Sequence, residues 1–386
     1  MNSRLKPVTL LACLAAAFLV WGCGPKPVKE QSVLDTPENH YQQGLRELER
    51  GNTDAASDEF GRAKALDPKY PGGYAGMGLV WAEKGDYNRA FEALDHALSR
   101  DAKFIDAFVF RGRVLTKQKK GEDWLGDAVK QFDKALKLDP ACEAALFHKG
   151  GAYKEAYAFG DAAAQFSKVV ALKGDYARPA NAEWELVQKI QRAAPGTKIG
   201  MKIALIPAID RADLAVLFVE ELKLVEVLQK RQPKVYDTRF RAPEDPTAFP
   251  AGAPAKEEPA SDLDGHWAKN WIKDVIKSGA MDVFPDRTFR PDEPINRSNY
   301  AVFLQNIIVT VTGDESLASK YFGSEGRFPD VNPTHFAYNA ICLAVDRGIM
   351  KTADPLDGAF KPRDPVSGAD ALLIIRDLQN ALRMTF

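Results

Sequence analysis

The sequence has few cysteines and histidines, and none is spaced as a metal site or a redox centre would require. The four cysteines are Cys13, Cys23, Cys142 and Cys342, with no close pair among them, and the five histidines are scattered. No phosphate loop, nucleophile elbow or pair of glycosidase-type carboxylates stands out. We therefore expect a binding protein with no cofactor, no metal and no catalytic residue. Cys142 and Cys342 fall on apolar helix faces, which favours buried thiols, and pairing between them stays open.

The chain also lacks an excess of charge of either sign. Lys and Arg total 52 against 53 Asp and Glu, and 45% of the 386 residues are hydrophobic. Without a basic excess, nothing attracts nucleic acid non-specifically, so we expect no nucleic-acid partner. The length and the hydrophobic content are enough for two or three packed domains.

An apolar run from residue 8 to residue 21 is too short for an ordinary transmembrane helix, and it follows the basic residues Arg4 and Lys6. This arrangement predicts an export signal. The run ends in Val-Trp-Gly-Cys at residues 20–23, which resembles the lipobox of bacterial lipoproteins. The alternative is an ordinary secretory signal with an incidental cysteine.

The lipobox resemblance implies that residues 1–22 are a signal peptide and that Cys23 carries the lipid, palmitate included. Two acyl chains on Cys23 would make membrane attachment stable. Residues 23–36 then form a polar tether. Gly24 in place of Asp implies, in a Gram-negative cell, the outer membrane facing the periplasm, and in a Gram-positive cell the outer face of the single membrane.

A repeat follows. Its alanines, Ala56, Ala90, Ala128 and Ala162, are 34, 38 and 34 residues apart, and each belongs to a series with a preceding glycine and a following large apolar residue. Glycine and alanine at fixed places let two antiparallel helices approach closely, and the large residues supply the packing between units. The four extra residues in the third unit fall in its turn, at residues 118–123. The pattern resembles the tetratricopeptide repeat (TPR), and implies a solenoid over residues 37–197 with four repeats and a capping helix.

The TPR resemblance implies a concave side lined by the first helix of each repeat. By register this side holds aromatic and basic residues suited to an extended peptide of a protein partner. They are Tyr41, Arg113, Lys117, Phe147 and Lys154. The set departs from the Asn-rich carboxylate clamp of chaperone-binding members, so we do not expect a chaperone tail.

Residues 233–260 contain repeated prolines that interrupt any helix, and they read as a linker. Beyond it, residues 261–268 read Ser-Asp-Leu-Asp-Gly-His-Trp-Ala and residues 284–291 read Phe-Pro-Asp-Arg-Thr-Phe-Arg-Pro. A second copy in the same order includes Phe-Pro-Asp-Val at 328–331 and Gly-Ala-Phe-Lys-Pro at 358–362. These motifs resemble S-layer-homology (SLH) repeats, two of them over residues 261–386. Residues 198–232 resemble the helix-start half of a third.

The SLH resemblance implies grooves that bind cell-wall polysaccharide or peptidoglycan, often through a sugar carboxylate met by an Arg at the helix start. Arg211 and Arg297 match that position, whereas the last copy has Ser367-Gly368 and no Arg. The other matched positions are Asp262, Trp267 and Asp286, for which turn capping and core packing are the alternative roles.

The sequence therefore predicts a mainly all-α, non-enzymatic cell-envelope lipoprotein. Its lipid would anchor it in a membrane, its SLH repeats would bind the cell wall, and its TPR groove would bind a protein. The alternative is an assembly factor of a secretion, pilus or exopolysaccharide export machine in which the SLH module is only structural. The Arg missing from the last copy favours the alternative, and Arg211 and Arg297 favour the tether.

Overall fold

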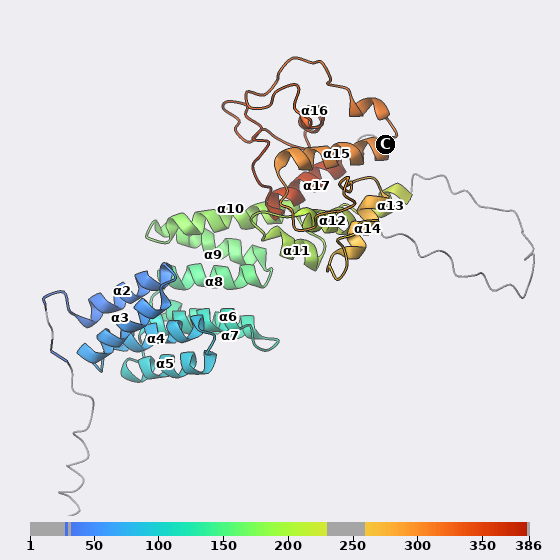
Figure 1. Cartoon of the computed structure of the whole chain (residues 1–386). Helices are drawn as coiled ribbons and strands as arrows, with labels where there is room; N and C mark the ends of the chain where they lie inside the picture. Colours follow the sequence, from blue (N-terminus) through green and yellow to red (C-terminus); the bar gives the residue numbers. More distant parts are fainter. Residues whose placement is uncertain (1–27, 30–31, 230–258, 384–386) are drawn as a thin grey trace, which may run out of the picture. The chain divides into compact units, whose positions relative to one another are not determined.

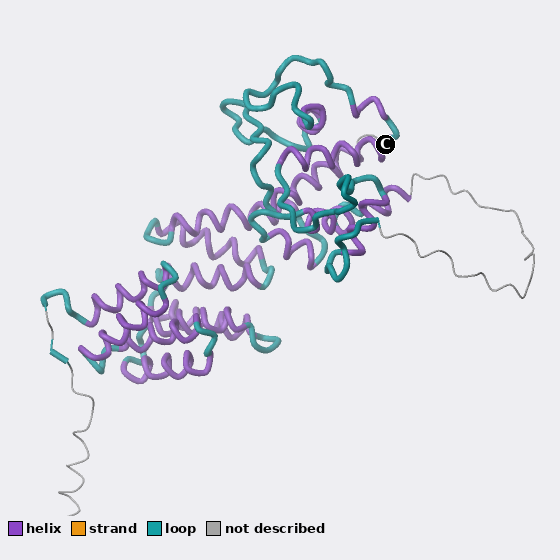
Figure 2. The backbone as a smooth tube through the Cα atoms, in the orientation of Figure 1, coloured by secondary structure: helices purple, strands orange, loops and turns teal. Residues whose placement is uncertain are grey.

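The computed structural model describes residues 28–29, 32–229 and 259–383. The expected signal peptide, the lipidation site Cys23 and nearly all of the Pro-rich linker lie outside these residues. The described residues form helices and loops with no strand, which confirms the predicted all-α class (Figure 2). None of the described helices has the length and apolar character needed to cross a bilayer. The chain divides into two compact units, Met1–Trp184 and Glu185–Phe386, and the boundary falls inside helix α10 (Ala177–Ala193).

The N-terminal unit consists of four antiparallel helix pairs in which each helix packs against the next (Figure 1). The pairs are α2 (Pro37–Glu49) with α3 (Thr53–Leu66), α4 (Pro71–Glu83) with α5 (Tyr87–Arg100), α6 (Ile105–Gln118) with α7 (Trp124–Leu138), and α8 (Glu143–Glu155) with α9 (Phe159–Leu172).

The helix ends follow local chemistry. Proline occupies the first turn of α2 and of α4, where its missing N–H costs no hydrogen bond. Thr36 caps α2 by accepting the backbone N–H of Asn39 on its hydroxyl oxygen. Gly51 and Gly85, with φ of 79° and 80°, make the turns inside the first two pairs, because an L side chain disfavours that conformation.

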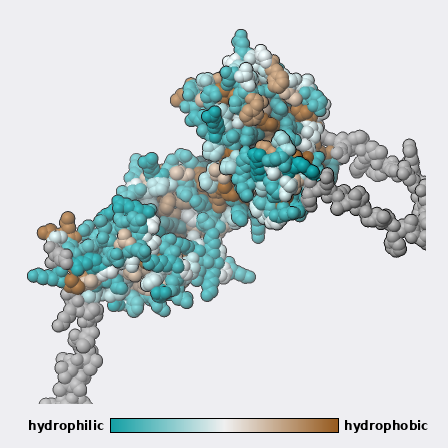
Figure 3. Space-filling view, in the orientation of Figure 1, coloured by the Kyte–Doolittle hydropathy of each residue, from teal (hydrophilic) through white to brown (hydrophobic). Residues whose placement is uncertain are grey.

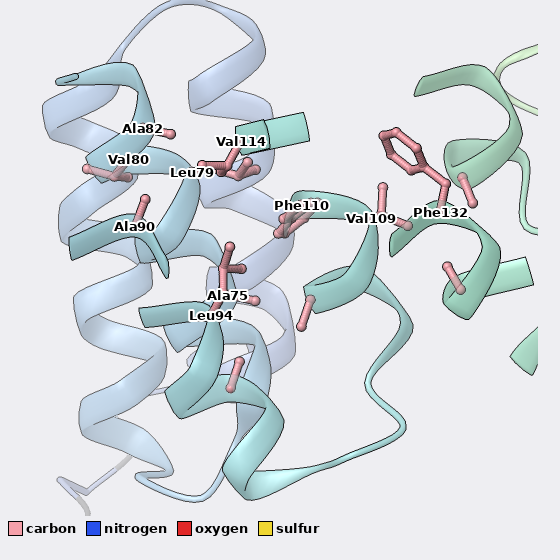
Figure 4. Packing of buried hydrophobic residues seen from close by; sticks show 14 of the residues in the cluster. Ala75, Leu79, Val80, Ala82, Ala90, Leu94, Val109, Phe110, Val114 and Phe132 are labelled. Atoms are coloured by element: carbon pink, nitrogen blue, oxygen red, sulfur yellow. The ribbon is translucent and has the colours of Figure 1, made fainter. Parts of the chain in front are cut away.

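Each pair is held by a glycine that faces a large apolar side chain of its partner helix. A Cβ placed on Gly44 would lie 2.5 Å from the Phe60 ring, and one on Gly112 would lie 2.6 Å from Phe132. Phe60 also packs against α4 of the next pair, because a Cβ on Gly76 would lie 2.3 Å from its ring. One side chain therefore packs both within and between repeats. These contacts belong to one buried hydrophobic cluster, and Figure 4 shows some of its residues, Leu79, Leu94 and Phe110 among them.

The extra residues of the third repeat lie where the sequence placed them. Helix α6 ends at Gln118, Lys119 adopts φ of 48° and Gly121 φ of 85°, and α7 begins at Trp124. The longer turn leaves the packing unchanged, since Phe132 stays fully buried. The four pairs form the TPR-like solenoid that the repeat predicted.

The C-terminal unit contains shorter helices joined by long loops (Figure 1). They are α11 (Lys198–Ala204), α12 (Arg211–Glu220), α13 (Leu224–Gln229), α14 (Lys269–Lys277), α15 (Arg297–Thr312), the 3-10 helix η1 (Glu315–Ala318), α16 (Tyr338–Asp346) and α17 (Gly368–Arg383). Helix α12 packs on α14 and α11 packs on α17, so residues before the linker share a core with residues after it.

Three backbone hydrogen bonds close a ring at the starts of α12, α15 and α17. The Ile209 N–H donates to the Val366 carbonyl at 2.9 Å, and Val366 donates to Ile295 at 3.1 Å. Ile295 donates back to Ile209 at 2.9 Å, and all three side chains are buried. Each segment thus satisfies one donor and one acceptor of its neighbours, as buried backbone groups require.

The residue after each member of this ring caps its helix. Asp210 accepts the N–H of the third residue of α12 at 2.7 Å, Asn296 does the same for α15 at 2.8 Å, and Ser367 for α17 at 3.1 Å. All three residue types are strong N-caps. The helix starts are therefore equivalent in geometry although their sequences differ.

Two adjacent glycines of α8 test the packing. Gly150→Ala places a methyl group 2.7 Å from the buried Phe166 ring, whereas Gly151→Ala meets nothing within 4 Å. We expect Gly150→Ala to lower the free energy of unfolding of the N-terminal unit by about 1–3 kcal/mol because of overpacking. Gly151→Ala should raise it by up to about 1 kcal/mol through helix propensity. Calorimetry of both variants measures the difference, and equal effects would contradict the packing.

Candidate functional site

The N-terminal unit has a cavity of about 490 Å³ lined by α4, α6 and α8, the first helices of repeats two to four. The polar residues that line it are Glu83, Arg113, Thr116, Lys117, Lys119, His148, Lys154 and Glu155. The structure therefore brings Arg113, Lys117 and Lys154 together, as the register predicted. Lys119 and His148 were not predicted. Lys119 follows the end of α6, and nothing in the sequence around His148 indicated that it would face the groove.

The charged groups of this cavity differ in whether they already have a partner. Three lysines are paired with glutamates, in the ion pairs Lys117–Glu83 (2.5 Å), Lys119–Glu155 (2.7 Å) and Lys154–Glu183 (2.6 Å). Arg113 has no ion pair with any residue that the structure describes. Burial lowers the pKa of His148 well below its usual value, and the nearby Arg113 adds to the shift, so His148 is neutral at pH 7. Among the described residues that line the cavity, Arg113 is the cation without an ion-pair partner, and its burial lowers its pKa.

Neither Tyr41 nor Phe147 lines this cavity; Tyr41 is buried, which corrects its expected place, and Phe147 is half-buried. Tyr41 is 2% exposed, and its hydroxyl donates to Asp106 at 2.5 Å. Phe147 packs against Phe166 and Tyr176, with ring centroids 5.8 Å and 5.1 Å away. Both lie on the helices that were predicted, but an aromatic side chain loses less by packing between repeats than by staying in water.

The C-terminal unit has a smaller groove of about 270 Å³ between the start of α12, the loop before α15, and α15 itself. It is lined by Arg211, Asp282, Val283, Phe284, Pro285, Glu293, Asn299, Val302, Phe303 and Phe336. Only Arg211 among them was a predicted site residue. Phe336 comes from the second motif copy, so residues of both copies reach this groove.

The two helix-start arginines bind backbone carbonyls of the following motif copy. Arg211 is 5% exposed and donates to the carbonyls of Phe289 and Asp282 at 2.7 Å and 2.8 Å. Arg297 donates to those of Phe360 and Lys351 at 2.8 Å and 2.6 Å. Two of the five N–H donors of each guanidinium are therefore used within the chain, and the contact of either arginine with a sugar carboxylate stays a prediction.

We call the contact between a helix start and the neighbouring segment a junction. The junction at the start of α17 lacks an arginine at this position and is held by a different arginine. Gly368 stands at the equivalent position, and a Cβ there would lie 1.8 Å from the Ile203 carbonyl oxygen, so no side chain fits. Arg376, two turns further along α17, donates to the carbonyls of Ala193 and Ala194 at 3.1 Å and 2.8 Å. An arginine thus holds each junction, but the third lies outside the motif and could not be found by matching it.

The two predicted aspartates cap loops. Asp262 accepts the N–H groups of Phe289 and Arg290 at 2.8 Å and 2.7 Å. Asp286 accepts from Thr288 and from the Arg290 guanidinium, and these hydrogen bonds lower its pKa to about 2. Together with Arg211 they fix one loop, residues 284–291. These contacts fit turn capping, the alternative role that the sequence left open for both aspartates.

Of the residues predicted to bind glycan, Trp267 is the most exposed aromatic one. Its side chain is 53% exposed beside Trp271, at a ring-centroid distance of 6.0 Å. Phe336 occupies the same motif position in the second copy and is 71% exposed. Exposed aromatic residues at a repeated position are candidates for ligand contact. The face shown in Figure 3 is mostly hydrophilic, with scattered hydrophobic residues. The repeated position of Phe336 is the signal that could have identified it from sequence.

Comparison with known proteins identifies the C-terminal module. Residues 261–301 and 327–372 match the family model of the S-layer homology domain. This chain carries two SLH domains. A 120-residue stretch is 30% identical to Cell surface glycoprotein 1 of Acetivibrio thermocellus, covering 30% of this chain and 5% of that protein. The SLH match indicates cell-wall attachment as the function class of this region.

Among solved structures, a thermophilic TPR protein of Thermus thermophilus aligns at 18% identity, covering 49% of this chain and 94% of that one, with a TM-score of 0.35. PilF of Pseudomonas aeruginosa aligns at 20% identity over 50% and 89% of the chains, with a TM-score of 0.33. Scores this low say nothing about function.

Cys142 and Cys342 are free thiols, half-buried and buried, and burial raises the pKa of each. A raised thiol pKa disfavours the reactive thiolate.

The arginine junctions of the SLH unit can be tested by mutation. Arg211→Ala removes two buried hydrogen bonds and leaves the Phe289 and Asp282 carbonyls without their donor. We expect the C-terminal unit to lose about 2–4 kcal/mol of stability. Arg363→Ala is the control, since Arg363 is exposed, and it should change stability by less than about 0.5 kcal/mol. Calorimetry of thermal unfolding measures both variants. If Arg211→Ala changed stability as little as Arg363→Ala, the structural role of Arg211 would be contradicted.

Proposed function

We propose that this protein is a non-enzymatic tether of the cell envelope. Its SLH unit attaches to cell-wall polysaccharide or peptidoglycan, and its TPR groove holds a protein partner. The SLH match carries the proposal, because it covers two successive motif copies, at residues 261–301 and 327–372. The partial likeness to a cell surface glycoprotein supports the same location.

We also propose that residues before the linker supply a third SLH-like repeat. Helix α12 begins with the same cap and the same arginine contact as α15. Trp271 of the first SLH domain donates to Glu220 at the end of α12 at 2.8 Å. A core shared across the linker supports a single wall-binding unit made of three parts.

The TPR groove supports the second half of the tether. Its cavity crosses three successive repeats, which suits an extended segment, and its rim lysines are neutralised by glutamates. Arg113 then offers the unpaired positive charge that an acidic group of the partner would meet. An interaction scaffold is the function that such a surface supports best.

The lipid anchor at Cys23 remains part of the proposal, with the outer membrane facing the periplasm as the location that Gly24 favours. Lipid at one end and wall polymer at the other would hold the partner at a fixed place in the envelope. The role is positional, and no chemistry is required of the chain.

Co-sedimentation of the soluble chain from residue 28 onward with peptidoglycan sacculi tests the wall attachment. We expect binding to intact sacculi, and strong weakening by the double variant Trp267→Ala, Phe336→Ala, because it removes both exposed aromatic residues. Leu356→Ala is the matched control, since Leu356 is apolar and 97% exposed in the same unit.

Repeating the assay after covalently attached polymer has been stripped from the sacculi separates polysaccharide from peptidoglycan as the target. A folded wild-type chain that stays in the supernatant with both preparations would refute wall attachment.

A further inference from the structure

The SLH groove has the composition of a site for an uncharged sugar. Its walls carry three phenylalanine rings, from Phe284, Phe303 and Phe336, and its polar groups are Asp282, Glu293 and Asn299 in addition to Arg211. Aromatic faces pack against the C–H face of a sugar ring, while carboxylate and amide oxygens accept hydrogen bonds from hydroxyl groups. At about 270 Å³ the groove suits a short stretch of glycan.

The positive charge of this groove is not available to an anion. Of the residues lining it in the described part of the chain, Arg211 is the only cation, and it is 5% exposed. Two of its donors already face carbonyls, and the rings of Phe284, Phe289 and Phe303 surround its guanidinium at 4.5–5.4 Å. With 5% of Arg211 exposed, little of the guanidinium is accessible to a sugar carboxylate.

The negative charges, by contrast, face the groove with few partners. The Asp282 side chain is exposed, and the Asn306 side-chain amide donates a hydrogen bond to it at 3.5 Å. Glu293 lies 4.0 Å from Arg290, which is itself paired with Asp286 at 2.9 Å. Two carboxylates beside one buried cation repel a further carboxylate, and like charges placed together at an interface cost affinity.

We propose that this groove binds an uncharged, hydroxyl-bearing sugar residue of the wall polymer and discriminates against a sugar that carries a carboxylate. Phe336 provides the stacking surface, and Asp282 and Glu293 accept the sugar hydroxyls. The proposal rests on the proposed wall attachment and names the sugar that this attachment selects. It reverses the role that the motif alone gives to Arg211.

The test uses polymer released from sacculi of the cells that make this protein, before and after its carboxylates are reduced to alcohols. Titration calorimetry with the chain from residue 28 onward measures both affinities. We expect the reduced polymer to bind at least as tightly as the untreated one, with little dependence on salt, because no ion pair forms.

Variants assign the binding to this groove. The double variant Asp282→Ala, Glu293→Ala should bind the reduced polymer about tenfold more weakly, since two acceptors of sugar hydroxyls are lost. Both side chains lie outside the core but also offset the charge of the buried Arg211, so thermal unfolding of the variant is measured alongside to show that it stays folded. Glu325→Ala is the control, because Glu325 is exposed in the same unit and does not line the groove, and it should bind like the wild type.

The possible failures are distinguishable. Loss of binding on carboxylate reduction overturns the uncharged-sugar assignment and leaves wall attachment standing. Unchanged binding by the double variant overturns the assignment to this groove. Absence of binding to intact sacculi and to both polymers overturns the wall attachment as well.

Discussion

The C-terminal unit depends on a ring of three backbone hydrogen bonds, in which Ile209, Ile295 and Val366 each donate to one neighbour and accept from the other. The ring fixes where α12, α15 and α17 begin. Once the helix starts are fixed, each loop between them must pass beside the next helix start, and an arginine holds the loop there. The groove at the α12–α15 junction follows from that arrangement. Because one member of the ring lies before the linker and two lie after it, the unit requires both parts of the chain.

Much of the N-terminal unit could be predicted from sequence, because its geometry repeats. A glycine lets the large apolar residue of the partner helix pack directly against its backbone. Because this pattern recurs at a fixed spacing, it predicted the four helix pairs and the longer turn of the third pair. The register could not predict how deeply each of these side chains is buried. Tyr41 and Phe147 are on the expected helices, yet Tyr41 is buried and Phe147 is half-buried against Tyr176. Periodicity determines the face of a helix, whereas burial also depends on which neighbours leave room for a ring.

In the SLH unit the motif located the helix starts and the turns, but the contacts of its residues could not be predicted from it. Arg211 and Arg297 lie at the expected helix starts, and their donors reach backbone carbonyls that come close only when the next copy folds against them. Arg376 replaces the missing third arginine from two turns away, which a fixed spacing cannot reveal. Asp262 and Asp286 cap turns. Phe336, which the motif places level with Trp267, is what gives the groove its exposed aromatic surface.

The central claim is that wall attachment resides in one unit built from residues on both sides of the linker. Co-sedimentation with sacculi of two fragments, residues 185–386 and residues 259–386, tests it most directly. The shorter fragment lacks Ile209 and Arg211, so it lacks one member of the ring and one arginine junction. We predict that the longer fragment sediments with the sacculi and that the shorter one stays in solution. Equal sedimentation of both fragments would contradict the claim.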